Sequence, residues 1–201
     1  AIAFVQGGTF QTTFANVPNA RLYGAEIEAQ KYFDLSGWGD LFATRRFFIS
    51  ANYTYTDSKL RVKAGDTTRF PLSGAIVPAT DIFKSGLPLT GQSDHVANLS
   101  FGFQDDEGLS EQTILLNYAS NRVAFRGPSG QPDLVEKPGI RLDVVVRQGI
   151  KLFGSEVEVK LEGRNLTNTR YQEFQRLNAS RIDTNTYVLG RTFQASVSAK
   201  F

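Results

Sequence analysis

Apolar and polar residues alternate with a period of two along most of this chain. In the segment 46–57, every second residue from Phe47 to Tyr55 is apolar, and Ser50, Asn52 and Thr54 lie between them. Successive side chains of a β-strand point to opposite faces, whereas a helix needs apolar residues three and four apart. The sequence therefore predicts an all-β chain. We expect about eight antiparallel strands, at residues 1–5, 10–32, 45–57, 94–104, 111–124, 138–150, 155–166 and 186–201.

The alternating segments have three features of membrane-spanning strands. Runs of about 10 to 14 residues suit a tilted span, whereas soluble strands typically have about five or six. Aromatic residues gather towards segment ends, as at a lipid interface. Short connections at 105–110 and 151–154 alternate with long ones at 58–92 and 169–185, as in outer-membrane barrels. We expect a transmembrane β-barrel with lipid outside and a wet interior. A soluble β-sandwich also alternates and stays an alternative.

A few residues break the alternation. Phe48, Leu115 and Val145 fall on the polar faces, and Lys31 and Arg191 fall on the apolar faces. A cation at the bilayer midplane costs roughly 2–4 kcal/mol, but little near the interface, which a long side chain can reach. Because both cations are near segment ends, we expect them at the membrane interfaces.

The composition removes several classes of function. The chain has 22 Lys and Arg against 20 Asp and Glu, too balanced for a nucleic-acid binder that relies on bulk charge. It has no Cys and one His, which leaves little for thiol, imidazole or metal chemistry. It lacks an apolar run of about 18 residues, so no transmembrane helix is expected. Without an initial Met, we expect either a removed leader or a piece of a longer chain.

Three segments resemble late-barrel motifs of TonB-dependent receptors. The string NVPNARLYGAEIEAQKYF resembles the segment that leads into a "YGxE" strand, GRNLTNTRYQEFQ resembles the "NLxxxxY" segment, and LGRTFQASVSAKF resembles the terminal "GRxF" strand. They follow the family's order and cover 16–201. The resemblance implies that 1–201 is the C-terminal portion of a barrel of about 22 strands, without the plug and the early strands. Unpaired strand edges are costly in hydrocarbon, so the piece must pair with missing strands or close as a small barrel.

By resemblance, the protein is an outer-membrane uptake receptor of a Gram-negative bacterium. The family binds a scarce ligand at its outer loops and is energised through TonB, with no covalent chemistry and no cofactor. An iron–siderophore complex is the expected cargo, and oligosaccharides and cobalamin are alternatives. Expected partners are outer-membrane lipid, the protein's own plug, TonB and the barrel-assembly machinery, which by resemblance reads a terminal aromatic residue, here Phe201. No nucleic acid is expected. A self-contained small outer-membrane barrel stays an alternative.

Candidate site residues fall into two groups. Basic residues in or beside the long connections could attract an anionic ferric chelate: Lys59, Arg61, Lys63, Arg69, Arg122, Arg126, Arg170 and Arg176. Charged residues on the polar faces should line the interior and meet a plug: Glu26, Glu28, Arg141, Asp143, Glu158, Lys160, Glu162 and Arg164. We expect no catalytic and no metal site, because His95 has no nucleophile placed beside it in sequence and 105–107 reads as a solvated acidic turn.

Overall fold

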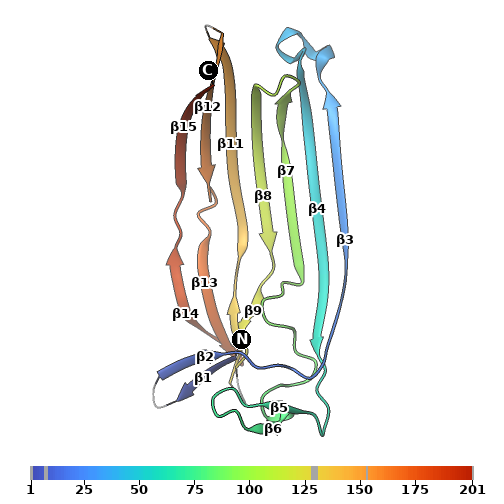
Figure 1. Cartoon of the computed structure of the whole chain (residues 1–201), viewed down its shortest axis with the longest axis vertical. Coiled ribbons are helices and arrows are strands. Elements are labelled where there is room, and N and C mark those ends of the chain that lie inside the picture. Colours follow the sequence, from blue (N-terminus) through green and yellow to red (C-terminus); the bar gives the residue numbers. More distant parts are fainter. Residues whose placement is uncertain (1, 7–8, 128–130, 153, 201) are drawn as a thin grey trace.

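The computed structural model describes residues 2–6, 9–127, 131–152 and 154–200, and one long antiparallel sheet organises them. Seven strands form this sheet, arranged up and down in chain order (Figure 1). From edge to edge they are β15 (Thr192–Lys200), β12 (Ser155–Arg164), β11 (Gly139–Leu152), β8 (Ser110–Ala119), β7 (His95–Asp105), β4 (Arg45–Leu60) and β3 (Ala20–Asp34). Each is long enough for a tilted span, which takes about 9–11 residues. The predicted all-β, antiparallel class is confirmed.

The predicted strand starts are accurate in the middle of the chain, but the predicted segment 111–124 runs past the end of β8 at Ala119 into a separate short strand at 122–125. Five predicted segments begin within one residue of an observed strand: 45–57, 94–104, 111–124, 138–150 and 155–166. The segment 10–32 is two strands, because β2 (Thr9–Thr13) pairs with β1 (Ile2–Gln6) in a separate sheet, and β3 begins only after Pro18, which has no N–H for a ladder. The segment 186–201 is interrupted at Gly190, which has φ of 75°.

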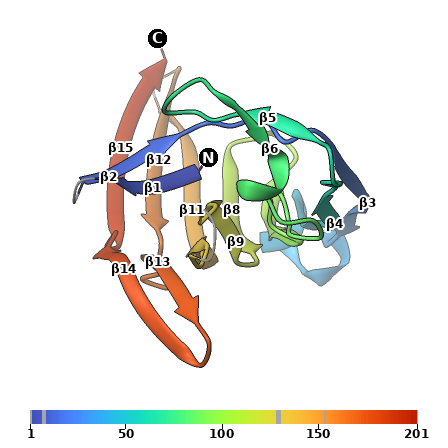
Figure 2. The same cartoon turned by 90° about the horizontal axis from the view of Figure 1, so that it is seen from below.

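The sheet is curved like a section of a wall (Figure 2), and side-chain contacts with the connection 61–94 place its polar face on the concave side. Ser58 and Leu60 share the polar face of β4 with Asn52, and both contact the connection 61–94, which Figure 2 places inside the curve. Side chains crowd on this face, where Phe48 is only 8% exposed. On the apolar face, Ile27 is 67% and Phe193 73% exposed. Lys31 lies three residues before the end of β3, and Arg191 directly precedes β15; their location at the membrane interfaces stays a prediction.

Short and long connections alternate between the two ends of the sheet, as the sequence predicts (Figure 1). The short ones are 106–109, 153–154 and the ten-residue turn 35–44, which holds two 3-10 turns, η1 (Ser36–Trp38) and η2 (Asp40–Phe42). The long ones, 61–94, 120–138 and 165–191, all lie at the other end. Among the described residues, no helix is long and apolar enough to cross a membrane.

Two of the long connections pair with each other and extend the wall beyond the spanning strands. They form a four-stranded sheet in which the hairpin of β13 and β14 splays outward (Figures 1 and 2). Its strands are β14 (Ser180–Val188), β13 (Arg170–Leu177), β10 (Leu134–Glu136) and β9 (Arg122–Phe125). The hairpin turns at Asn178, whose φ of 54° is one that Asn adopts more readily than most residues.

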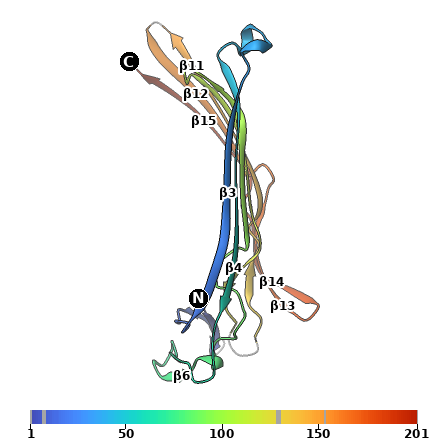
Figure 3. The same cartoon turned by 90° about the vertical axis from the view of Figure 1, so that its right-hand side faces the viewer.

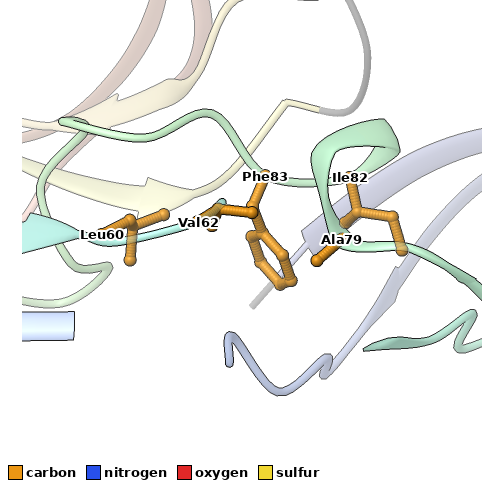
Figure 4. Close-up of a cluster of buried hydrophobic side chains, with 5 residues drawn as sticks. All are labelled: Leu60, Val62, Ala79, Ile82 and Phe83. Carbon is orange, nitrogen blue, oxygen red and sulfur yellow. The ribbon is translucent and has the colours of Figure 1, made fainter. Parts of the chain in front are cut away.

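The longest connection, 61–94, folds around a small apolar core of its own. It contains a hairpin of β5 (Thr67–Arg69) and β6 (Ile76–Pro78), followed by the 3-10 turn η3 (Ala79–Asp81). Its buried cluster is Leu60, Val62, Ala79, Ile82 and Phe83 (Figure 4). The connection lies beyond the end of the wall and on its concave side (Figure 3). Burial of this cluster therefore helps to hold the 34-residue connection in place.

The described sheet is open. In the residues that the structure covers, its edge strands β3 and β15 do not pair with each other. Nor does a second sheet cover the seven strands face to face in this part of the chain, which a β-sandwich would require (Figure 2).

Candidate ligand-binding site

A row of three amides and one carboxylate crosses four neighbouring strands on the polar face. Asn117 on β8 donates a hydrogen bond to Asn98 on β7 (2.7 Å), and Asn98 donates one to Asn52 on β4 (2.7 Å). Asn52 then donates to a carboxylate oxygen of Glu26 on β3 (3.3 Å). Because directly opposite residues in antiparallel strands share a face, the alternation itself aligns this row. The result is a wet, hydrogen-bonding surface across the inner wall.

Charged side chains continue this surface over β8, β11 and β12. Arg147 contacts Glu111 (3.0 Å) and Glu158 (3.6 Å), which lie on the strands on either side of it. Glu162 contacts both Lys160 and Arg164. These ion pairs lie on the face predicted to line the interior.

The remaining polar-face candidates lie on the same wall. Glu28 lies opposite Asn52, and Arg141 lies opposite Asn117. Asp143 accepts a hydrogen bond from the backbone N–H of Asn165 (2.7 Å), so it also shapes the point where β12 ends. That Asn165 has φ of 53°, which turns the chain out of the strand.

A cavity of about 650 Å³ opens where the long connections meet. The connection 61–94 supplies one wall, including Ile82, Phe83 and Lys84, and the loop after β9 and the tip of β13 supply Asp133 and Arg176. The apolar cluster of Figure 4 thus forms part of the lining, with charged groups around it. A volume of this size accommodates a small molecule, since ligand pockets typically measure about 300–1,000 Å³.

Arg126 joins the walls of this cavity. The residue is 2% exposed, and its guanidinium contacts the Asp133 carboxylate and the backbone oxygen of Pro88. Asp133 also accepts a hydrogen bond from the N–H of Gly127 (3.0 Å). Burial lowers the pKa of the Arg126 guanidinium, and Asp133 opposes that shift. The pair ties the connection 61–94 to the loop after β9.

Arg122 is engaged in a similar way. Its guanidinium forms two hydrogen bonds with the carboxylate of Glu136, at 2.8 and 2.9 Å. This bidentate pair joins β9 to β10 and borders a second hollow of about 300 Å³ on the polar face. Arg122 and Arg126, two of the predicted ligand contacts, therefore also hold the loops together.

The other basic candidates are dispersed. Arg176 is exposed and lines the 650 Å³ cavity. Arg61, Lys63 and Arg69 are exposed on the folded connection and do not line it, and Arg69 donates a hydrogen bond to the oxygen of Gly74 in its own hairpin (2.8 Å).

Two further basic candidates lie on the apolar face. Lys59 belongs to β4, which runs beyond the predicted end at residue 57, and it pairs with Asp57 (3.3 Å). Arg170 opens β13 and is exposed on that same face. Phe201 lies outside the described residues.

The sequence analysis did not single out three charged residues of the cavity lining, Asp81, Lys84 and Asp133. Lys84 belongs to a connection singled out for its basic residues, but it follows the η3 turn, which no periodicity predicts. Asp133 lies between Pro132 and β10 with no local motif. The excess of arginines over acids in the connections could have prompted a search for their carboxylate partners.

His95 and the acidic turn 105–107, the two features weighed as chemical sites, make contacts that stabilise the fold. The Tyr53 hydroxyl and His95 Nδ1 are 2.8 Å apart on the apolar face. Asp105 accepts hydrogen bonds from the N–H groups of Glu107, Leu109 and Ser110, so it closes the tight turn between β7 and β8. Within the described residues, no three His, Cys, Asp or Glu side chains gather as a metal site.

Comparison with known proteins identifies the family. The family model described as "TonB dependent receptor-like, beta-barrel" matches residues 1–166. No curated protein and no solved structure matches the chain. The match covers six of the seven strands of the wall and the connections 61–94 and 120–138, and it ends before β13, which supplies Arg176 to the cavity. The family is one of outer-membrane receptors for transport. This chain belongs to the TonB-dependent receptor-like β-barrel family.

Proposed function

We propose that residues 1–201 are the C-terminal portion of an active-transport receptor in the outer membrane of a Gram-negative bacterium. The receptor takes up a scarce ligand, an iron–siderophore complex, with energy supplied through TonB. The observation that carries this proposal is the 650 Å³ cavity, which folded connections enclose at one end of the wall. In this family, a cavity among the long connections lies where a ligand arriving from outside would first bind.

The lining suits an anionic chelate with an apolar framework. Ile82 and Phe83 offer apolar surface, and the cations Lys84 and Arg176 stand beside it. Within the described part of the chain, neither cation has a carboxylate within 4.0 Å. Arg126 is already paired with Asp133, so we assign ligand binding to Lys84 and Arg176 first. Arg61, Lys63 and Arg69 on the same connection would contribute long-range attraction.

The open edges of the sheet support the placement within a larger barrel. Backbone groups at the outer edges of β3 and β15 need partners in hydrocarbon. Preceding strands of the same receptor supply them, and the charged inner wall faces a plug. Phe201 is proposed as the terminal signal for the barrel-assembly machinery. A self-contained seven-stranded barrel would instead require β3 to pair with β15.

Uptake by cells that carry the intact receptor tests the cargo. We expect the receptor gene to support uptake of radiolabelled iron from one member of a ferric-siderophore panel, and deletion of TonB to abolish it. The double variant Lys84→Ala/Arg176→Ala should weaken binding of that chelate at least about tenfold, since a hydrogen bond to a charged group contributes roughly 1.5–3 kcal/mol.

The matched control removes a cation at the other end of the wall. Lys151→Ala breaks an exposed pair with Glu107 (2.9 Å) beside a short connection, and binding should not change. Saturable uptake of cobalamin or an oligosaccharide, with no ferric chelate bound, would contradict the cargo and leave the receptor assignment intact. Uptake that does not depend on TonB would contradict the energy source.

A further inference from the structure

A third hollow lies on the outside of the wall. It measures about 570 Å³ and lies where the segment 165–169, between β12 and β13, passes the start of β11. Tyr118 of β8 and Ile140 of β11 line it from the spanning strands, and Lys137, Arg170 and Gln172 line it from the long connections. None of its lining residues is an Asp or Glu. This hollow is separate from the 650 Å³ cavity, with which it shares no residue.

The strand register places this hollow on the apolar face. Ile140 lies directly opposite Tyr118, which follows Leu116 and Ile114 along the apolar face of β8. On β13, Tyr171 lines the 300 Å³ hollow on the polar face. Because successive residues of a strand alternate between faces, its neighbours Arg170 and Gln172 point to the apolar face. The N–H of Lys137 bonds to the oxygen of Gln172 (2.9 Å), which brings Lys137 alongside them.

The two cations have no acid to neutralise them. Lys137 and Arg170 are exposed, and among the described residues neither has a carboxylate within 4.0 Å. Both also border the 300 Å³ hollow on the polar face, which lies at the end of β8. The carboxylate there belongs to Glu136, and Arg122 already holds it with two hydrogen bonds. The hollow therefore presents uncompensated positive charge on a face that is otherwise apolar.

The depth of the hollow matches a membrane boundary. Tyr118 is next to the last residue of β8, Lys137 lies two residues before β11, and Arg170 is the first residue of β13. Apolar surface for acyl chains thus ends where the cations begin. Aromatic rings mark this level in membrane proteins, and basic pockets at it bind lipid head groups.

We propose that this hollow binds a phosphorylated lipid of the outer leaflet. The phosphate contacts Lys137 and Arg170, the polar head group contacts Gln172, and an acyl chain lies along Tyr118 and Ile140. The inference rests on the membrane placement of the wall and is independent of the cargo. The hydroxyls of Thr167 and Thr169 are already bound to the backbone oxygen of Ile140, which fixes the floor of the hollow.

Lipid retention by the purified full-length receptor tests the site. The probe is lipid A, which carries phosphate monoesters, and native mass spectrometry in detergent measures how tightly it is retained. Lys137→Ala/Arg170→Ala should weaken retention about tenfold or more, because charge-assisted hydrogen bonds to phosphate are lost. Lys137→Arg with Arg170→Lys should keep it. Enzymatically dephosphorylated lipid A should bind the unaltered receptor as weakly as lipid A binds the alanine variant.

The control removes two cations from the same face at the opposite end of the strands, Lys31→Ala/Arg45→Ala. Its lipid A retention should equal that of the unaltered receptor. An equal loss in both double variants would mean bulk charge attraction and would overturn the site. Displacement of the lipid by millimolar inorganic phosphate would make free phosphate the ligand and would also overturn the proposal. Ferric-chelate binding by the Lys137/Arg170 variant should stay normal, which separates this test from that of the cargo.

Discussion

At the scale of single residues, the main lesson concerns how arginines are paired. Arg122 and Arg126 lie in the long connections, but Glu136 and Asp133 hold their guanidinium groups. An anionic ligand would have to displace a carboxylate to reach either of them, and removing one partner of a buried pair leaves the other uncompensated. Exposed cations such as Lys84 and Arg176 carry no such cost. Position in a connection is therefore a weaker guide to ligand contact than the absence of a carboxylate partner.

Gly102 offers a residue-scale prediction about the wall. It lies on the polar face of β7, opposite Phe48 and Thr113, and a Cβ at this position would be 1.8 Å from the backbone oxygen of Gln112. Gly102→Ala must separate β7 from β8, so we expect a loss of roughly 1–3 kcal/mol of stability or more. The denaturant midpoint of the full-length receptor in detergent, followed by its gel mobility shift on unfolding, measures this.

The matched control for that substitution is Gly37→Ala. Gly37 lies in the turn between β3 and β4, and a Cβ added there would have no atom within 4 Å, so the midpoint should not move. Equal midpoints for Gly102→Ala and the unaltered protein would mean that the strands accommodate the methyl group, and the close approach would then have no structural role.

At the scale of elements, period-two alternation predicts the spanning strands because one face of each is apolar along its whole length. The predicted segment 155–166 and the observed β12 differ only at the end, where Asn165 turns the chain. The strands of the connections escape prediction for a physical reason. β9 and β10 have four and three residues, and their pairing depends on contacts such as that of Arg122 with Glu136, distant in sequence.

The 650 Å³ cavity could not be predicted from the sequence either. Its walls come from 62–87, 126–127, 131–133 and the tip of β13, which approach one another only after the wall has formed. The general location, among basic connections at one end, followed from the alternation of short and long connections. The individual contacts did not, because irregular backbone has no period from which to infer which side chains point inward.

The folded connection 61–94 supports a prediction at the element scale. Phe83 is buried in its apolar cluster, and Phe→Ala changes in cores cost about 3–5 kcal/mol. Since Leu60, the last residue of β4, is the one member of the cluster that belongs to the seven-stranded sheet, Phe83→Ala should loosen the connection and leave the wall folded. We expect trypsin to cleave after Lys84 on the surface of intact cells at least about tenfold faster, because local opening exposes the segment.

Ile76→Ala serves as the control, because Ile76 is on the same connection but 71% exposed. Its cleavage rate should match that of the unaltered receptor. If Phe83→Ala instead abolished the gel mobility shift of the whole barrel, the connection and the wall would form one cooperative unit rather than two separable ones.

At the scale of the whole molecule, the two faces of the sheet should meet different solvents. Labels at Ile49, Leu99 and Val159 lie on the apolar face of β4, β7 and β12, and labels at Ser50, Asn98 and Lys160 lie on the polar face of the same strands. The chain has no Cys, so single nitroxide labels are straightforward in this region. In a receptor reconstituted in bilayers, the first set should collide mainly with oxygen dissolved among acyl chains. The second set should be less accessible to oxygen, because a wet and occupied interior surrounds it.

The same accessibility to oxygen for both sets, or protection of the first set from oxygen, would mean that the apolar face packs against protein. In that case the charged concave surface would be the outside of a soluble module, and the cavity, the lipid site and the transport function would lose their common basis.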